Sequence, residues 1–284
     1  MKISKRIVLV IVWMAAASTN AQAQDAKRGE YLATAGGCKA CHTEETKDAV
    51  PFAGGSALKT PFGSFFAPNI TPHPQAGIGS WSEADFMRAL REGIRPDGAH
   101  YYPAFPYTSF TKIVDADAKD LYTYFRSLPP SARASTPHDL KFPFGFRFLN
   151  AIWKWLFFTP GPFVPDPSRS QELNRGAYLV QALSHCSECH TPRNVLGASR
   201  KDRFLAGGKT PDDKDIPNIT PTRLKKMSDS DLIQYLQTGL TADGDVAAEP
   251  MGEVITNTLS KLTAPDINAV VAFLRSVAPQ PEEK

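Results

Sequence analysis

The chain has 284 residues, of which 42% are hydrophobic, 32 are basic and 29 are acidic. This length is too great for one small helical domain and suits two. The net charge of +3 equals the three basic residues of the first 23, so the remaining chain is neutral, which argues against nucleic-acid binding because such proteins usually carry a concentrated basic face.

Residues 1–23 have the pattern of a secretory signal peptide. Basic residues come first, an apolar stretch follows at 7–17, and small residues ending at Ala23 form a cleavage site. The apolar stretch is too short to span a bilayer, which argues against a retained membrane anchor. We therefore expect cleavage near Ala23 and export to the periplasm.

The motif C-x-x-C-H occurs twice, at 38–42 and at 186–190, and it uses every cysteine of the chain. Thiols three positions apart share one face of a helix, where they can bond both vinyl groups of one porphyrin, and the following histidine can bind the iron. A zinc site would instead join both pairs in one tetrahedron. The sequence thus predicts two covalently bound haem c groups. The residues expected to hold them are Cys38, Cys41, His42, Cys186, Cys189 and His190.

Both motifs belong to an internal repeat. The recurring strings are Arg-Gly-x-Tyr-Leu at 28–32 and 175–179, Pro-Asn-Ile-Thr-Pro at 68–72 and 217–221, and a similar final segment at 121–128 and 270–277. Two long copies, each with its own cofactor motif, indicate duplicated domains rather than a solenoid.

The local patterns within each copy predict helices. Ser82 and Ser228 each stand three residues before an aspartate, a capping-box arrangement that opens helices over 85–91 and 231–237. The final segment of each copy has apolar residues at helical spacing, and Thr263 caps the second one. Long alternating runs, which would indicate a sheet, are missing from the sequence.

We therefore expect an all-α fold with domains at 24–130 and 171–284, joined by a linker at 131–170. Each domain would wrap around one covalent haem. Gly29 and Gly176 would allow the last helix of each domain to cross the first closely. In this respect the halves resemble the small class I cytochrome c fold.

Each iron needs a ligand opposite its histidine. In the second half we expect Met251, in the loop at 249–252, although a buried thioether that only fills space is the alternative. In the first half the matching loop carries Phe105, which cannot bind iron. His100 lies five residues earlier and is a candidate ligand, with a solvated loop histidine as the equal alternative. An open iron would instead permit peroxide chemistry.

The residues around the irons are predicted less directly. The histidine of each motif needs an acceptor for its other ring nitrogen, and the backbone carbonyls near Pro68 and Pro217 are candidates. Arg193 could pair with a haem propionate, because a guanidinium matches a carboxylate, or it could serve a surface role.

The linker differs in composition from both halves. It is rich in proline, has five basic and two acidic residues, and concentrates aromatic residues at 142–163. Such a stretch can contact a partner or a membrane surface, or it can pack between the two domains. We favour packing or partner contact, because no continuous apolar span is long enough to cross a bilayer.

The paired strings, together with Leu90-Arg-Glu-Gly, Tyr102-Pro-Ala-Phe-Pro-Tyr and Cys189-His-Thr-Pro-Arg-Asn, carry a family resemblance. Over nearly its whole mature length the chain resembles the cytochrome c subunits of bacterial membrane-associated dehydrogenases, which serve alcohol, aldehyde, gluconate and nicotinate-type oxidations. The resemblance implies that a catalytic dehydrogenase subunit supplies electrons, which pass on to a quinone, a cytochrome or an oxidase. Well-studied relatives differ in carrying three haems, and many have methionine where Phe105 stands.

The sequence therefore predicts a periplasmic dihaem electron carrier that performs no substrate chemistry itself. A dihaem peroxidase-like enzyme, with an open haem in the first half, is the alternative. A membrane-docked protein that uses the aromatic linker is a third possibility.

Overall fold

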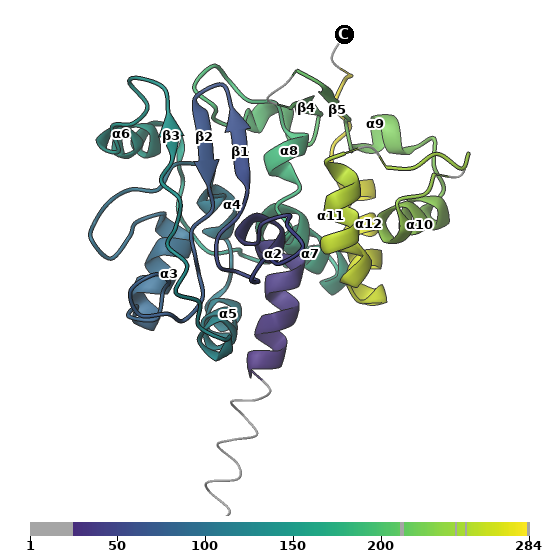
Figure 1. Ribbon diagram of the computed structural model, residues 1–284. Coiled ribbons are helices and arrows are strands. Elements are labelled where there is room, and N and C mark those ends of the chain that lie inside the picture. Colours follow the sequence, from purple (N-terminus) through teal and green to yellow (C-terminus); the bar gives the residue numbers. More distant parts are fainter. Residues whose placement is uncertain (1–24, 211–212, 242, 248, 283–284) are drawn as a thin grey trace, which may run out of the picture.

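The computed structural model describes residues 25–210, 213–241, 243–247 and 249–282. The expected signal peptide and its cleavage site lie outside this range. The first half contains a helix at 25–35, α2 (Cys38–His42), α3 (Glu83–Glu92), α4 (Tyr107–Phe110) and α5 (Asp115–Ser127), and the linker contains α6 (Phe148–Phe157) (Figure 1). The second half contains α7 (Gln171–Tyr178), a π-helical turn (Leu179–Leu183), α8 (Ser187–His190), α9 (Pro221–Leu224), α10 (Asp229–Thr238), α11 (Met251–Asn257) and α12 (Ala264–Ser276). Short 3-10 turns lie at Lys201–Arg203 and Leu259–Lys261.

The first and last helices of each half cross in close contact, as the glycines predict. A Cβ atom on Gly29 would lie 2.1 Å from the carbonyl oxygen of Asp120 in α5, and one on Gly176 would lie 1.9 Å from that of Ala269 in α12. Any side chain at either position would push the helices apart. The predicted capping boxes at the starts of α3 and α10 are also confirmed, with both reciprocal hydrogen bonds present.

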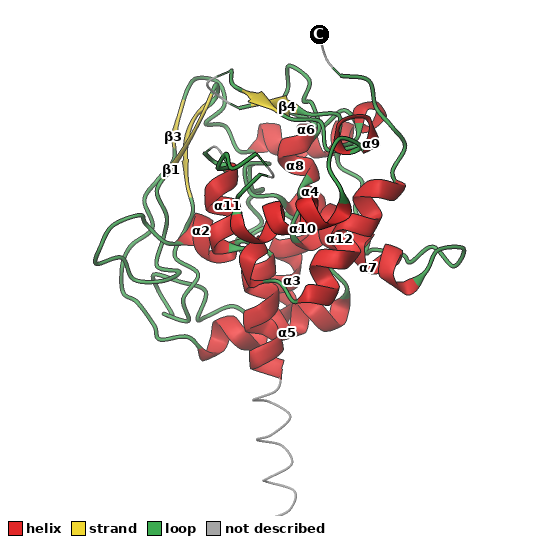
Figure 2. Cartoon of the chain, turned by 90° about the vertical axis from the view of Figure 1, so that its right-hand side faces the viewer, coloured by secondary structure: helices red, strands yellow, loops and turns green. Residues whose placement is uncertain are grey.

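The expectation of an all-α fold needs a correction, because two small antiparallel sheets are present among the helices (Figure 2). The first sheet joins β1 (Ala57–Thr60), β2 (Gly63–Phe66) and β3 (Asp139–Leu140), and the second joins β4 (Gly208–Lys209) and β5 (Asp215–Ile216). Each strand has four residues or fewer, so its alternation is too short to recognise in the sequence. Because β3 comes from the linker, this sheet fastens the linker to the first half.

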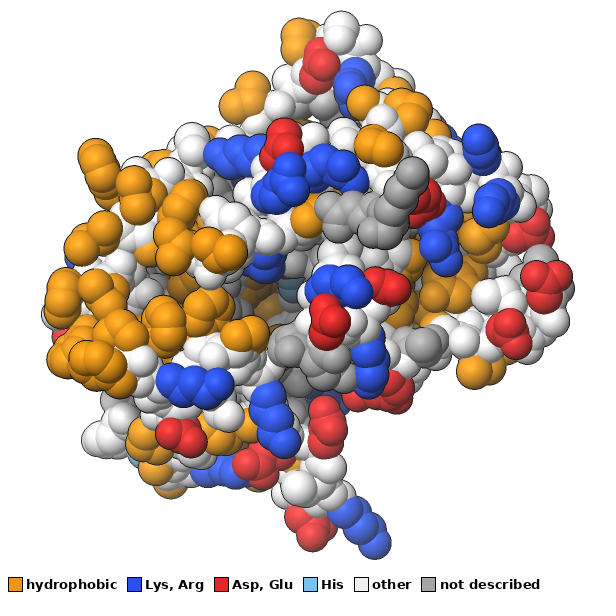
Figure 3. Space-filling view, turned by 90° about the horizontal axis from the view of Figure 1, so that it is seen from above, with side chains coloured by type: hydrophobic (Ala, Val, Ile, Leu, Met, Phe, Trp, Pro, Cys, Tyr) orange, Lys and Arg blue, Asp and Glu red, His pale blue; other side chains and the backbone are white. Residues whose placement is uncertain are grey.

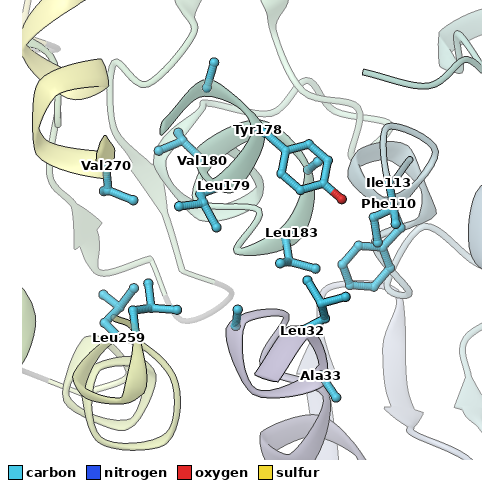
Figure 4. Close-up of a cluster of buried hydrophobic side chains, with 14 of the residues drawn as sticks. Leu32, Ala33, Phe110, Ile113, Tyr178, Leu179, Val180, Leu183, Leu259 and Val270 are labelled. Atoms are coloured by element: carbon cyan, nitrogen blue, oxygen red, sulfur yellow. The ribbon is translucent and has the colours of Figure 1, made fainter. Parts of the chain in front are cut away.

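The two halves share one hydrophobic core. Leu32 and Phe110 of the first half lie in the same buried cluster as Tyr178, Leu183 and Val270 of the second (Figure 4). Leu32 is 1% exposed and Leu183 is fully buried. The burial of these side chains stabilises the contact between the halves as well as each half by itself.

The arginine of the repeated Arg-Gly-x-Tyr-Leu string forms ion pairs inside each half, with Asp117 and Asp120 in the first and with Asp266 in the second. Arg28 binds Asp117 of α5 in the first half. Arg175 binds Asp266 of α12 in the second, with Nε–Oδ1 and NH2–Oδ2 distances of 2.7 and 2.6 Å. The arginine of the first helix therefore holds the last helix of its own half.

The tyrosine of the same string reaches the opposite half. The Tyr31 hydroxyl donates to Oδ2 of Asp266 at 2.6 Å, and the Tyr178 hydroxyl donates to Oδ2 of Asp117 at 2.7 Å. Each aspartate thus joins an arginine of its own half to a tyrosine of the other. This reciprocal exchange relates the two copies much as the subunits of a symmetric dimer are related.

Candidate haem sites

In the first half the Cys38–His42 motif forms the short helix α2. The Nδ1 atom of His42 donates to the carbonyl oxygen of Pro68 at 2.7 Å. Burial lowers the pKa of His42, although the carbonyl opposes the shift, so the ring is neutral. With its proton on Nδ1, the imidazole presents the lone pair of Nε2 for binding to a metal.

The second half repeats this geometry. His190 ends α8, is 9% exposed, and donates from Nδ1 to the carbonyl oxygen of Pro217 at 2.8 Å. Burial likewise lowers its pKa. The prediction that carbonyls near Pro68 and Pro217 orient the two histidines is therefore confirmed.

The Pro-Asn-Ile-Thr-Pro strings hold these carbonyls in position. Oδ1 of Asn69 accepts hydrogen bonds from the amide and the hydroxyl of Thr71, at 2.9 and 2.7 Å. Asn218 accepts the same pair from Thr220, at 2.8 and 2.7 Å. All four residues are buried, which explains why the string is identical in both copies.

The four thiols fit haem attachment better than a bare metal. None is in a disulfide, and burial raises the pKa of Cys38 and of Cys186 to about 12. A zinc site would need four ligands gathered around one ion. Within the part of the chain that the structure describes, no group of three or more His, Cys, Asp or Glu side chains is placed to bind a metal ion.

The loops that contain Phe105 and Met251 are built alike in the two halves. In each half, one loop residue donates its backbone amide to the carbonyl of the glycine that ends the preceding helix, at 2.8 Å in the first half and 2.7 Å in the second. This loop residue lies four positions before Phe105 in the first half and four positions before Met251 in the second. Phe105 therefore occupies the position of Met251, as the repeat indicates. Met251 begins α11 and is partly buried against the core.

His100 lies beside the linker. Its carbonyl accepts from Arg147 at 3.1 Å, and burial together with the charge of Lys154 in α6 lowers its pKa. Its Nδ1 atom is buried and has no hydrogen-bond partner among the described residues. The matching residue, Val246, is 74% exposed. The role of His100 as an iron ligand stays a prediction.

Arg193 has protein partners rather than a free guanidinium. It donates to Oε2 of Glu188 at 2.6 Å and to the Glu188 and Gly197 carbonyls at 2.9 and 2.7 Å. The propionate contact that the sequence suggested as one alternative stays a prediction.

Glu188, inside the second haem motif, was not recognised from the sequence. Its Oε1 atom accepts from Thr108 and Ser109 of α4 in the first half, at 2.7 and 2.6 Å. Burial raises its pKa, but Arg193 and the two hydroxyls outweigh burial, and the pKa is lowered overall. The only local signal was a carboxylate within C-x-x-C-H followed by an arginine five residues later.

The two haem motifs lie close together. The Ser184 hydroxyl, just before the second motif, donates to the carbonyl of Ala35, just before the first, at 2.9 Å. The Cys189 thiol is near enough for its charge to raise the pKa of Cys41, in addition to the effect of burial. Helix α11, which carries Met251, also packs against α2 of the first half.

Two haem-attachment motifs with carbonyl-held histidines, in a mainly helical fold, define a c-type cytochrome. The cytochrome c family matches residues 26–129. A dihaem c-type cytochrome of Cereibacter sphaeroides is 45% identical over 257 residues, which cover 89% of this chain and 86% of that protein. The chain belongs to this family of dihaem c-type cytochromes, and covalently bound haem c is its cofactor.

Components of dehydrogenases are also similar to the chain. One component of the nicotinate dehydrogenase of Pseudomonas putida is 44% identical across 90% of this chain and 22% of its own length. The fructose dehydrogenase cytochrome subunit of Gluconobacter japonicus is 44% identical across 90% of this chain and 53% of its own. The chain thus spans about half or less of these two proteins. The resemblance noted from the sequence is confirmed.

Proposed function

We propose that this protein is a periplasmic dihaem electron carrier that is reduced by a catalytic dehydrogenase subunit. The hydrogen bond from Ser184 to Ala35, which joins the segments just before the two haem motifs, supports this proposal most directly. Bound haem c supplies a one-electron iron couple. The chain contributes two oriented histidines and two pairs of thiols within one shared core.

The relatives support the proposed partners. Proteins similar to this chain are named as cytochrome subunits of fructose, gluconate and quinone-dependent alcohol dehydrogenases. By analogy, a dehydrogenase subunit would donate electrons, and a quinone, a cytochrome or an oxidase would accept them. The signal-peptide pattern at 1–23 supports export to the periplasm.

Each half would wrap one haem, with different ligands opposite the two histidines. Met251 would complete the second iron, since a partly buried thioether at the start of α11 suits that role. His100 is the candidate for the first iron. Its buried Nδ1 has no partner among the described residues, which leaves ring nitrogen available if the loop moves.

The test of the carrier is a titration of the exported holoprotein. Mass spectrometry should find two attached haems, and spectroelectrochemistry should find two low-spin one-electron centres. Mixing with a reduced dehydrogenase subunit of this type should reduce both centres. A polypeptide without haem, or oxidation of an alcohol or sugar by the isolated chain, would contradict the proposal.

Phe105 supports a second candidate, a peroxidase-like enzyme. Phenylalanine stands where the other half has Met251, and a phenyl ring cannot bind iron. An open first iron would give a high-spin spectrum and peroxide turnover. Two low-spin haems without turnover would exclude this alternative, and a His100→Ala variant with an unchanged spectrum would remove His100 as a ligand.

A further inference from the structure

The linker helix α6 is oriented with its apolar side outward. Its buried residues are Asn150 and Lys154. Phe148, Ile152 and Trp155, at helical spacing, are 64, 51 and 81% exposed. A helix on the surface of a soluble domain normally turns its apolar stripe inward. This reversed arrangement indicates that the outer face of α6 contacts something apolar.

The inner side of α6 is fixed by polar contacts, so the orientation is well defined. The ammonium group of Lys154 donates to the carbonyls of Glu92 and, at 2.8 Å, Gly93, which end α3. It also lies 4.7 Å from the centre of the Tyr107 ring. A cation at the carboxyl end of a helix and over an aromatic face is favourable. Turning α6 over would break all of these contacts.

The loop before α6 extends the same apolar surface. Phe142 is 86% exposed and Phe146 is 51% exposed, and their rings lie 6.0 Å apart. Phe146 in turn lies 6.0 Å from Phe148 of α6. Every exposed residue from Phe142 to Leu156 is apolar or glycine. The space-filling view shows hydrophobic side chains gathered over this side of the molecule (Figure 3).

A lipid bilayer fits this surface better than a protein. Protein interfaces usually have a polar rim and about one hydrogen bond per 100–200 Å². Among the exposed side chains of 142–156, the indole of Trp155 alone can donate a hydrogen bond, so this surface has no polar rim of its own. From Leu140 to Pro165 the chain has no acidic residue, and besides the buried Lys154 it has the exposed Lys141 and the partly exposed Arg147, a charge that suits anionic headgroups. Among the described residues no helix is long and apolar enough to span a membrane.

We propose that α6 and the 142–148 loop form an interfacial membrane-docking surface, which lies in the headgroup layer of an anionic bilayer. Aromatic and aliphatic side chains on one face of a helix, with basic residues nearby, are the usual features of such a helix. The docking surface goes beyond the electron-transfer proposal and does not depend on it, because it uses no haem ligand.

The test is flotation of the holoprotein with phosphatidylcholine vesicles that contain phosphatidylglycerol, followed by haem absorbance. We expect the protein to float, and to stay partly bound in high salt because apolar side chains are inserted. The variant Phe148→Ser/Ile152→Ser/Trp155→Ser should lose at least about tenfold in partition coefficient. These side chains are exposed, so the fold should persist, which circular dichroism and an unchanged haem spectrum would verify.

A matched control replaces exposed valines outside the docking surface, Val50→Ser/Val246→Ser, and should bind vesicles as the wild type does. The proposal is overturned if the wild type fails to float, if the triple variant floats equally well, or if high salt abolishes binding completely. Dimerisation through this surface without vesicle binding, seen in sedimentation, would also overturn it. Reduction of both haems by a soluble donor is measured separately, so failure here leaves the carrier proposal intact.

Discussion

The two halves of the molecule hold the histidines of their haem motifs alike, but they differ at the loop position expected to supply the second iron ligand. His42 and His190 donate to equivalent proline carbonyls at 2.7 and 2.8 Å. Across the site, Phe105 in one half replaces Met251 in the other. The attachment side is constrained by covalent geometry and by the buried Asn–Thr pairs. The loop that carries Phe105 or Met251 differs between the halves, and an iron ligand in that loop would set the potential of its haem.

The largest effect should come from the close helix crossings, where the halves are most alike. We expect Gly29→Ala and Gly176→Ala each to lower the free energy of unfolding by about 3 kcal/mol, because the new methyl would overlap a backbone carbonyl. Denaturant titration measures this. Gly145→Ala, where a Cβ meets no atom within 4 Å, should change stability little. Tolerance of both crossing variants would show that the helices can separate freely.

The two tyrosines that reach the opposite half should contribute unequally to the free energy of unfolding. Tyr178 is 5% exposed and donates to Asp117, which is 1% exposed. Tyr178→Phe should cost about 2 kcal/mol because a buried hydrogen bond to a carboxylate is lost. The partly exposed Tyr31→Phe should cost about 1 kcal/mol. Chemical denaturation gives both values, and equal losses would contradict the burial argument.

A third tyrosine, Tyr122, provides a control that distinguishes the loss of a contact between the halves from the loss of a contact within one half. The Tyr122 hydroxyl donates to the Trp81 carbonyl at 3.0 Å inside the first half. Tyr122→Phe should therefore lower stability without weakening the contact between halves. Limited proteolysis within the linker should increase for Tyr178→Phe and stay at the wild-type rate for Tyr122→Phe.

The loops that contain Phe105 and Met251 should give the two haem irons different reduction potentials. If Met251 binds the second iron, Met251→Ala should lower the potential of one centre by roughly 0.1 V and leave the other unchanged. Spectroelectrochemistry reads both centres. Met227→Ala, which removes the other partly buried methionine of that half, should leave both potentials in place. Phe105→Met should raise the potential of the first centre and make the halves more alike.

The smallest effect concerns Lys154, the linker residue that packs on the first half. Burial lowers its pKa to about 8, against the ordinary 10.5, so the unfolded chain binds more protons between these values. Stability should therefore rise as pH increases from about 8 towards 10, by only about 1 kcal/mol because the Gly93 carbonyl and the Tyr107 ring favour the charged amine and offset much of the burial effect. Lys154→Met should remove this rise, measured by urea titrations across the pH range. An unchanged slope in the variant would contradict it.

Some of the fold could be predicted because its signals are local. The capping boxes at Ser82 and Ser228 involve residues three positions apart, and both helices begin there. The small sheets could not be predicted, because their strands are too short to show alternation. Nor could the pairing of Arg193, since its partner Glu188 owes its position to hydroxyl groups 79 and 80 residues away.

The sequence alone determined the attachment of two haems and the orientation of their histidines. Thioether attachment depends on five consecutive residues, and an identical Pro-Asn-Ile-Thr-Pro string carries the carbonyl that each histidine needs. Only the tertiary structure decided how the halves join. Tyr31 and Asp266 are 235 residues apart, and the packing of both copies around one core brings them together. It also decided that α6 faces outward, because the contacts of Lys154 lie on a helix about 60 residues earlier.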